Sequence, residues 1–171
     1  LFFFNPSLNL NVEISPFVKI SIRALRENNI NLNALRYLPQ ATMRNYRLFI
    51  KGADSLERRS KNSFGVNVNY RNPVKSIFAG INLTQTYDVN GLMAENNFDG
   101  PIILQNLLFN SNSASTSRIS GHFGKGIDNL NATVSMKVNY THSEVEILQN
   151  QRMFTHTIKS FELAPKFIAA P

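Results

Sequence analysis

Apolar and polar side chains alternate along much of this chain, most clearly between Ser63 and Asp88. The first arm of this stretch carries apolar side chains at Phe64, Val66, Val68 and Tyr70. After Asn72-Pro73-Val74-Lys75 the alternation resumes in the opposite phase, with Ile77, Ala79, Ile81, Leu83 and Tyr87. A period of two residues on both sides of a short Asn-Pro turn predicts a β-hairpin. Each arm would be about 9–12 residues long, which exceeds the usual soluble strand and approaches the length that crosses a tilted bilayer.

Two other stretches repeat this strand–turn–strand design. Near the N-terminus, alternating residues lie on both sides of Ser15-Pro16-Phe17, and Pro16 is expected in the turn because proline donates no backbone hydrogen bond. The third unit runs from Ser113 to Glu146, with a predicted glycine-rich turn at Gly124–Asn129. A last strand, from about Gln151 to Leu163, changes phase along its length, which predicts a β-bulge.

Long connections separate these units. Asn28–Asn62 is expected to contain either a short helix capped by Asp54 or, as we prefer, strand extensions at Arg44–Lys51 and Glu57–Ser63. Val89–Asn112 contains two apolar patches, expected to pack within a loop or to form one turn of helix: Ile102-Ile103-Leu104 and Leu107-Leu108-Phe109. Tight turns at one end and long loops at the other are typical of a transmembrane barrel.

Composition narrows the choice of class. The 171 residues could form one domain with a sizeable core, and the hydrophobic content of 43% argues against bulk disorder. No apolar run is long enough for a spanning helix, and the absence of cysteine excludes disulfides and thiolate metal sites. Because the chain starts at Leu1-Phe2-Phe3-Phe4 and ends at Pro171, we expect it to be part of a longer protein.

The net charge of +7 raises the question of nucleic acid. The basic residues form no stripe, and their densest group is Arg58-Arg59 with Lys61. We therefore expect no nucleic-acid partner, and interpret the charge as a solvated loop or a barrel lumen facing anionic solutes.

Candidate chemistry is sparse. His142 and Glu144 should share one strand face, while His122 and His156 are expected on neighbouring strands, as exposed polar residues and not as zinc ligands. Three Asn-Xaa-Thr triplets, at Asn82, Asn131 and Asn139, are expected inside strands and not as glycosylation sites. Gly124-Lys125-Gly126 lacks the strand–loop–helix context of a phosphate loop. We expect no catalytic, cofactor or metal residues, no cofactor, and no enzyme.

Three tyrosines, Tyr70, Tyr87 and Tyr140, are expected near strand ends. They would form an interfacial girdle in a membrane barrel, or reflect ordinary β-propensity.

The stretch Tyr70-Arg71-Asn72-Pro73-Val74-Lys75-Ser76-Ile77-Phe78-Ala79 resembles a tight-turn motif in the barrels of Bacteroidetes TonB-dependent outer-membrane receptors. Gly124–Asp128 is similar to a second such turn and Ser15–Phe17 to a third. The resemblance implies a plugged barrel of about 22 strands, of which this chain would supply about six, without the plug domain. It also implies the outer membrane of a Gram-negative cell as the location. The implied partners are the lipid bilayer, the rest of the barrel, the plug, the TonB complex acting through the plug, and a surface lipoprotein.

The expected fold is therefore all-β, an antiparallel meander of long hairpins forming a segment of a transmembrane β-barrel. The expected function is part of a receptor for TonB-dependent nutrient uptake. The alternative is a soluble β-sandwich that acts as an adhesin or carbohydrate-binding module. The two long connections would be extracellular loops contacting substrate or a surface partner, and the isolated chain would self-associate.

The alternation also predicts two faces of the sheet. One face should carry nine apolar residues: Phe64, Val66, Val68, Ile77, Ile81, Leu83, Val134, Met136 and Val138. The other should carry Asn67, Asn69, Asn82, Ser135 and Lys137.

Overall fold

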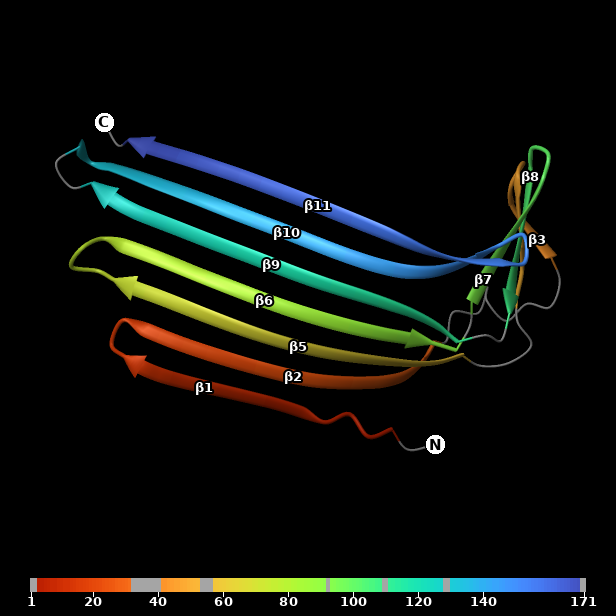
Figure 1. Cartoon of the computed structure of the whole chain (residues 1–171), viewed down its shortest axis with the longest axis horizontal. Helices are drawn as coiled ribbons and strands as arrows, with labels where there is room; N and C mark the ends of the chain where they lie inside the picture. The colour runs from red at the N-terminus through yellow and green to blue at the C-terminus, as the bar shows by residue number, and fades with distance from the viewer. Residues whose placement is uncertain are drawn as a thin grey trace.

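The computed structural model describes residues 3–31, 41–52, 57–91, 93–108, 111–127 and 130–169. These residues form eleven β-strands: β1 (Ser7–Ser15), β2 (Val18–Asn31), β3 (Ala41–Asn45), β4 (Leu48–Lys51), β5 (Glu57–Asn72), β6 (Ile77–Asn90), β7 (Met93–Asp99), β8 (Ile102–Leu108), β9 (Asn112–Ile127), β10 (Ala132–Gln149) and β11 (Arg152–Ala169). Seven long strands lie side by side, and the four short ones gather at one end (Figure 1).

The long strands form the antiparallel meander that the alternation predicts. Their order is β1-β2-β5-β6-β9-β10-β11, and each neighbouring pair is antiparallel. There are seven such strands among the described residues instead of the expected six or so, and the longest have 18 residues. Long ladders join each strand to the next, with one register shift in β1, so the position of each strand is set by direct pairing with its neighbour.

The short strands depart from the predicted meander. β3 pairs with β4 and β7 with β8, and these two hairpins are joined by a parallel pairing of β4 with β8. β7 also runs parallel to the end of β10, where Leu148 lies opposite Glu95. The whole is therefore one mixed sheet, and we refer to β3, β4, β7 and β8 as the loop-end sheet.

Several predictions for the long connections need correction. Arg44–Lys51 is part of a hairpin and not one strand, because Asn45 Oδ1 accepts hydrogen bonds from the backbone N–H of Arg47 at 2.9 Å and of Leu48 at 2.8 Å. The apolar patches Ile102–Leu104 and Leu107–Leu108 lie in strand β8 and not in a loop or helix, since both edges of β8 are paired. Glu57–Ser63 begins β5 as expected, while Asp54 and Phe109 lie outside the described residues.

The tight turns lie mainly at one end of the sheet, which we call the turn end (Figure 1). Pro16–Phe17 and residues 73–76 connect long strands there, as predicted. Gly124–Gly126, in contrast, lies within β9, which ends at Ile127, and Asp128 and Asn129 of the predicted turn lie outside the described residues. Asn150 and Gln151 form a further tight turn at the opposite end, the loop end, with φ values of 46° and 61°.

The predicted bulge in the last strand is wrong. The β10–β11 register is continuous from the pair Ala132–Ala169 to the pair Gln149–Arg152. The change of phase therefore means only that Phe154 and Ile158 lie on the opposite face of the sheet from Phe161 and Leu163. A register shift does occur elsewhere among the described long strands. It lies in β1, between Glu13 and Ser15, beside the Pro16 turn.

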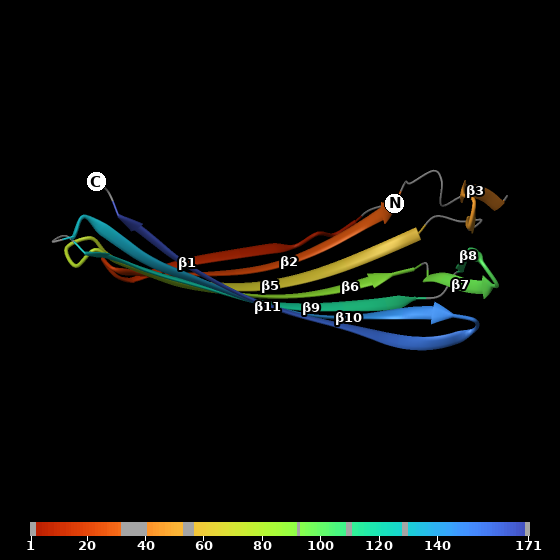
Figure 2. The ribbon, with the colours of Figure 1, turned by 90° about the horizontal axis from the view of Figure 1, so that it is seen from above.

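The sheet is an open single layer. Among the described residues β1 pairs only with β2 and β11 only with β10, and Figure 2 shows a twisted, curved sheet with these strands at its two edges. Met93 and Ala132 are the buried hydrophobic residues of the described chain, so the long strands enclose no core. Among the described residues no helix is long and apolar enough to cross a membrane.

Candidate functional site

The sheet has one apolar face, and the strand register defines it. Val66 lies opposite Leu83, which lies opposite Ile119, and Ile119 in turn lies opposite Tyr140 on β10. The row continues to Leu10 on β1 at one edge and to Phe161 on β11 at the other. The nine apolar residues predicted to share a face do so, because the same parity is kept across all seven long strands.

The other face is polar by the same register. Asn67 lies opposite Asn82, which lies opposite Ser120, and this row ends at Asn139 and Glu162. The five polar residues predicted to share this face are confirmed on it: Asn67, Asn69, Asn82, Ser135 and Lys137. Successive residues of a strand thus present opposite chemistry to the two sides of one layer.

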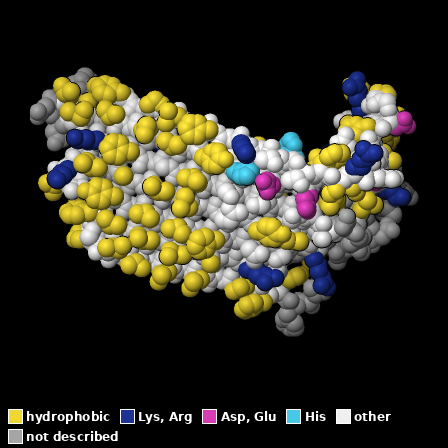
Figure 3. Space-filling view, in the orientation of Figure 1, with side chains coloured by type: hydrophobic (Ala, Val, Ile, Leu, Met, Phe, Trp, Pro, Cys, Tyr) yellow, Lys and Arg dark blue, Asp and Glu magenta, His cyan; other side chains and the backbone are white. Residues whose placement is uncertain are grey.

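The apolar face is exposed (Figure 3). Ile81, in the interior strand β6, keeps 54% of its surface accessible, and Phe161, in the edge strand β11, keeps 68%. Exposed apolar surface costs about 25 cal/mol per Å² in water, so this face requires a covering that the described residues do not provide. On β11 the apolar side chains run from Phe161 to Ala169, about 26 Å along the strand at 3.3 Å per residue. Transmembrane barrels carry an apolar band of about 25 Å.

We call this exposed apolar area of the long strands the apolar band. Polar side chains border it toward the loop end. On the same face, the next pairs beyond Leu83, Ile119, Tyr140 and Phe161 are Gln85, Ser117, His142 and Lys159. Tyr70, Tyr87 and Tyr140 all lie on the apolar face, and Tyr140 is the last apolar residue before His142. Tyr70 and Tyr87 lie near strand ends as expected, whereas Tyr140 lies in the middle of β10 because that strand continues to Gln149.

The polar face carries a shallow groove of about 710 Å³ between β1 and β6. Amides and hydroxyls dominate its lining, with two basic residues: Asn9, Asn11, Ser21, Arg23, Lys61, Asn67, Asn82 and Thr84. Such groups both donate and accept hydrogen bonds, so this surface suits water or a hydroxyl-rich or amide-rich ligand. Beside it, Gly80 leaves space for the His122 ring, since an added Cβ would overlap that ring and lie 2.7 Å from Asn69 Oδ1.

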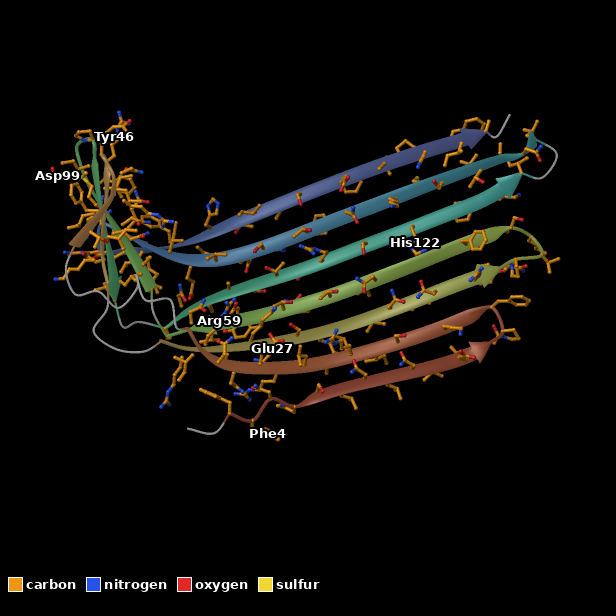
Figure 4. The ribbon with its side chains drawn as sticks, turned by 180° about the vertical axis from the view of Figure 1, so that it is seen from behind. Phe4, Glu27, Tyr46, Arg59, Asp99 and His122 are labelled. Carbon is orange, nitrogen blue, oxygen red and sulfur yellow. The ribbon has the colours of Figure 1, made fainter. Side chains whose placement is uncertain are left out.

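Ion pairs stabilise the loop end of the polar face. Arg59 Nε donates to Asp88 Oδ1 at 2.9 Å and to Oδ2 at 3.0 Å, and Arg59 Nη2 also contacts Oδ2. Lys61 Nζ lies 4.0 Å from Glu27 Oε2. Arg59 and Glu27 lie close to this end in Figure 4, and the described pairing shows that much of the densest basic group is balanced by acids.

The histidines do not form one site. His142 Nε2 lies 3.4 Å from Glu144 Oε1, and the two share a strand face as predicted. His122 on β9 and His156 on β11 lie on the two strands that neighbour β10, as predicted, but their register places them on the polar face, whereas His142 lies on the apolar face. Among the described residues no group of three His, Asp or Glu side chains could hold a metal ion.

The Asn-Xaa-Thr triplets divide into two kinds. Asn82 and Asn139 lie inside strands as expected. Asn131 lies instead in the turn before β10, with a φ of 43°.

The loop-end sheet is the feature that sequence reasoning missed. It presents exposed side chains at its tip, among them Tyr46, which is 76% accessible and whose ring lies 5.0 Å from the Arg47 guanidinium carbon. Tyr46 and Asp99 mark its far end in Figure 4. The signal available was the turn pattern Asp99-Gly100-Pro101 directly before the apolar run Ile102-Ile103-Leu104.

The chain was compared with protein-family models, with curated proteins and with solved structures, and no match was found in any of the three comparisons.

Proposed function

We propose that this chain is part of an outer-membrane β-barrel receptor that takes up nutrients in a TonB-dependent manner. The observation that carries the proposal is the exposed apolar band on one face of seven long antiparallel strands, with a polar face behind it. Lipid is a covering that fits a band of this height and composition, and water in a lumen fits the amide-rich opposite face. A soluble sandwich would instead need a second sheet on the apolar face, and none of the described residues supplies one.

The ends of the strands support an orientation. In outer-membrane barrels short turns face the periplasm and long loops face the outside. The turn end would therefore be periplasmic, and the loop-end sheet would stand at the cell surface, where a substrate or a surface lipoprotein could meet it. The remaining strands of the barrel would continue from the free edges of β1 and β11, and a plug would contact the polar face.

Cysteine labelling tests this proposal directly, because the chain contains no cysteine. In the full-length protein in outer-membrane vesicles, Met136→Cys and Ile81→Cys should react with a lipid-soluble maleimide and resist a charged one. The adjacent variants Lys137→Cys and Asn82→Cys should react with the charged reagent. Equal reaction of Met136→Cys and Lys137→Cys with the charged reagent would contradict a lipid-facing band.

The orientation has its own test. Protease added to intact cells should cut between β2 and β5 or between β6 and β9 and leave the turn end intact. Cleavage that requires an opened periplasm would reverse the orientation. A TonB-dependent role further predicts that deletion of this gene and deletion of TonB cause the same growth defect on the transported nutrient.

A further inference from the structure

Two adjoining hollows lie on the apolar face near the loop end, between β1, β2, β5 and β6. The first, of about 460 Å³, is mainly apolar and is lined by Leu8, Ala24, Phe64 and Tyr87 among others. The second, of about 590 Å³, is lined by Phe4, Arg58 and several backbone and amide groups. Arg26 lines both hollows, so an apolar space continues into a basic one.

Hydrogen bonds fix the wall of the basic hollow. The side-chain amide of Asn28 donates to the Phe4 carbonyl at 2.8 Å, and the Asn28 backbone N–H donates to Asn5 Oδ1 at 2.6 Å. The Arg26 backbone N–H donates to the Pro6 carbonyl at 3.0 Å. The segment before β1, which carries Phe4, is thereby held alongside β2 (Figure 4), and Phe4 lines the basic hollow.

Three arginines line this hollow, and two of them, Arg26 and Arg58, have their guanidinium groups available. Within the described part of the chain no ion pair involves Arg26 or Arg58, whereas the neighbouring Arg59 is paired with Asp88 on the opposite face. Both are exposed, and Figure 3 shows basic side chains where the hydrophobic area ends at the loop end. An anion is the natural partner for two such groups in one hollow.

The position of the site relative to the band points to the kind of anion. Arg26 lies opposite Asn62 on the apolar face. This pair is two residues closer to the loop end than the pair Ala24–Phe64, a distance of about 7 Å along the strand. Tyr87 lies in the same row, and tyrosine is enriched at membrane interfaces. Polar headgroups occupy roughly the first 5–8 Å beyond the hydrocarbon core on each side, so Arg26 lies at headgroup level if the band spans the bilayer.

We propose that the two hollows form a binding site for a phosphorylated lipid of the outer leaflet. An acyl chain would fill the apolar hollow at Leu8, Ala24 and Phe64, and the phosphate would lie between the guanidinium groups of Arg26 and Arg58. Guanidinium matches phosphate with paired hydrogen bonds, and Arg58 approaches from four residues farther along β5. This proposal rests on the membrane location argued above.

The test uses the full-length protein in maltoside micelles, with bound lipid measured by native mass spectrometry. The probes are dioleoyl phosphatidic acid, which has both chains and phosphate, dioleoylglycerol, which lacks phosphate, and inorganic phosphate, which lacks chains. Arg26→Gln combined with Arg58→Gln should weaken phosphatidic acid binding about tenfold, as expected for losing one or two charge-assisted hydrogen bonds. The matched control is Arg118→Gln combined with Arg152→Gln, which removes the same charge from the polar face and should leave binding unchanged.

Phe64→Ser tests the apolar hollow and should weaken phosphatidic acid binding without creating any binding of inorganic phosphate. Equal losses in the arginine pair and its control would overturn the site. Tight binding of inorganic phosphate alone would show a soluble-anion site and would also overturn the lipid proposal. Labelling of Met136→Cys in the same preparation separates this proposal from the membrane location on which it rests. If Met136→Cys reacts as a lipid-facing residue but the lipid probes bind without selectivity, the lipid site is refuted and the membrane location stands.

Discussion

Asn72 Oδ1 accepts a hydrogen bond from the backbone N–H of Lys75 at 3.1 Å and thereby closes the tight turn between β5 and β6. Asn72 is 8% exposed, and its amide also donates to the Tyr70 hydroxyl at 3.2 Å. The Asn-Pro pair in the motif that resembles receptor barrels therefore has a structural reason: the asparagine supplies the acceptor and the proline, which follows it, fixes φ in the turn.

Asn72→Ala should lower the free energy of unfolding by about 1 kcal/mol, because it removes this acceptor and leaves a turn N–H without its partner. The measurement is urea-dependent folding of the full-length protein into phospholipid vesicles. Asn11→Ala, an exposed polar-face change, is the control and should shift the midpoint little. If both variants shift it equally, the turn hydrogen bond contributes nothing specific.

Gly126 and Ser76 bring two of the turn-end segments together. The Gly126 N–H donates to the Ser76 carbonyl at 2.8 Å, and a Cβ on Gly126 would lie 2.8 Å from the Ser76 Cβ. Ser76 also has a φ of 49°, a conformation that glycine adopts more easily.

Gly126→Ala should therefore destabilise the protein by about 1–3 kcal/mol through this overlap. Ser76→Gly should be neutral or stabilising by itself, and it should recover most of the loss in the Gly126→Ala background. The same vesicle-folding assay measures all three variants. Additive effects of the two changes would show that the overlap is not the cause.

The Arg59–Asp88 pair joins β5 to β6 at the loop end, with the Asp88 side chain 13% and the Arg59 side chain 42% exposed. Asp88→Asn should cost about 1–3 kcal/mol, since it replaces a bidentate charged partner with a neutral one. A double-mutant cycle with Arg59→Gln should give a coupling energy of about 1 kcal/mol that falls as salt is raised. A coupling energy near zero would mean that the pair adds no stability.

The alternation was sufficient to predict the antiparallel meander of long strands, although it indicated about six strands and not seven, and to assign the two faces of β5, β6 and β10. A period of two residues fixes which side chains share a face, and sequential hairpins fix the neighbours. Val66 and Asn67 could therefore be assigned to opposite faces without any tertiary information.

Other features depend on contacts that no local pattern encodes. The pairing of Phe49 with Leu104 joins strands of four and seven residues that are far apart in the sequence. The phase change before Phe161 suggested a bulge because alternation was assumed to follow one apolar side along the whole strand. In the part of β11 nearer the loop end, before Phe161, apolar residues are not confined to one face. Ile158 therefore lies on the opposite face from Phe161 although the register of β11 against β10 is continuous. The basic hollow at Arg26 and Arg58 likewise exists only because three strands, β2, β5 and β6, meet Phe3 and Phe4 there.

Met136 and Lys137 are sequence neighbours on opposite faces of β10, where they lie opposite Phe123 and His122. In the membrane-embedded protein, Met136→Arg should cost about 2–4 kcal/mol, because it places a charge in the hydrocarbon region. Lys137→Ala should change stability by less than about 0.5 kcal/mol, because it truncates an exposed side chain on the aqueous side. Folding into vesicles measures both, and a larger penalty for Lys137→Ala would reverse the assignment of the faces.

The final prediction concerns the 171-residue chain by itself. Within the described residues its long sheet has unpaired edges at β1 and β11, and its apolar face carries exposed residues such as Phe161 and Phe167. Because β1 and β11 are the first and last of seven alternating strands, they run in the same direction, and a second copy with its apolar side on the same face cannot join β1 to β11 by antiparallel pairing. Two copies can still associate face to face, or β11 to β11, since exposed edges and apolar patches both drive association.

We therefore expect light scattering in detergent-free buffer to show oligomers whose size grows with concentration. Added maltoside, which covers the apolar face, should shift the distribution toward monomers. A stable monomer without detergent would show that the apolar face is sealed within the chain, and it would favour a soluble β-sandwich over a membrane receptor.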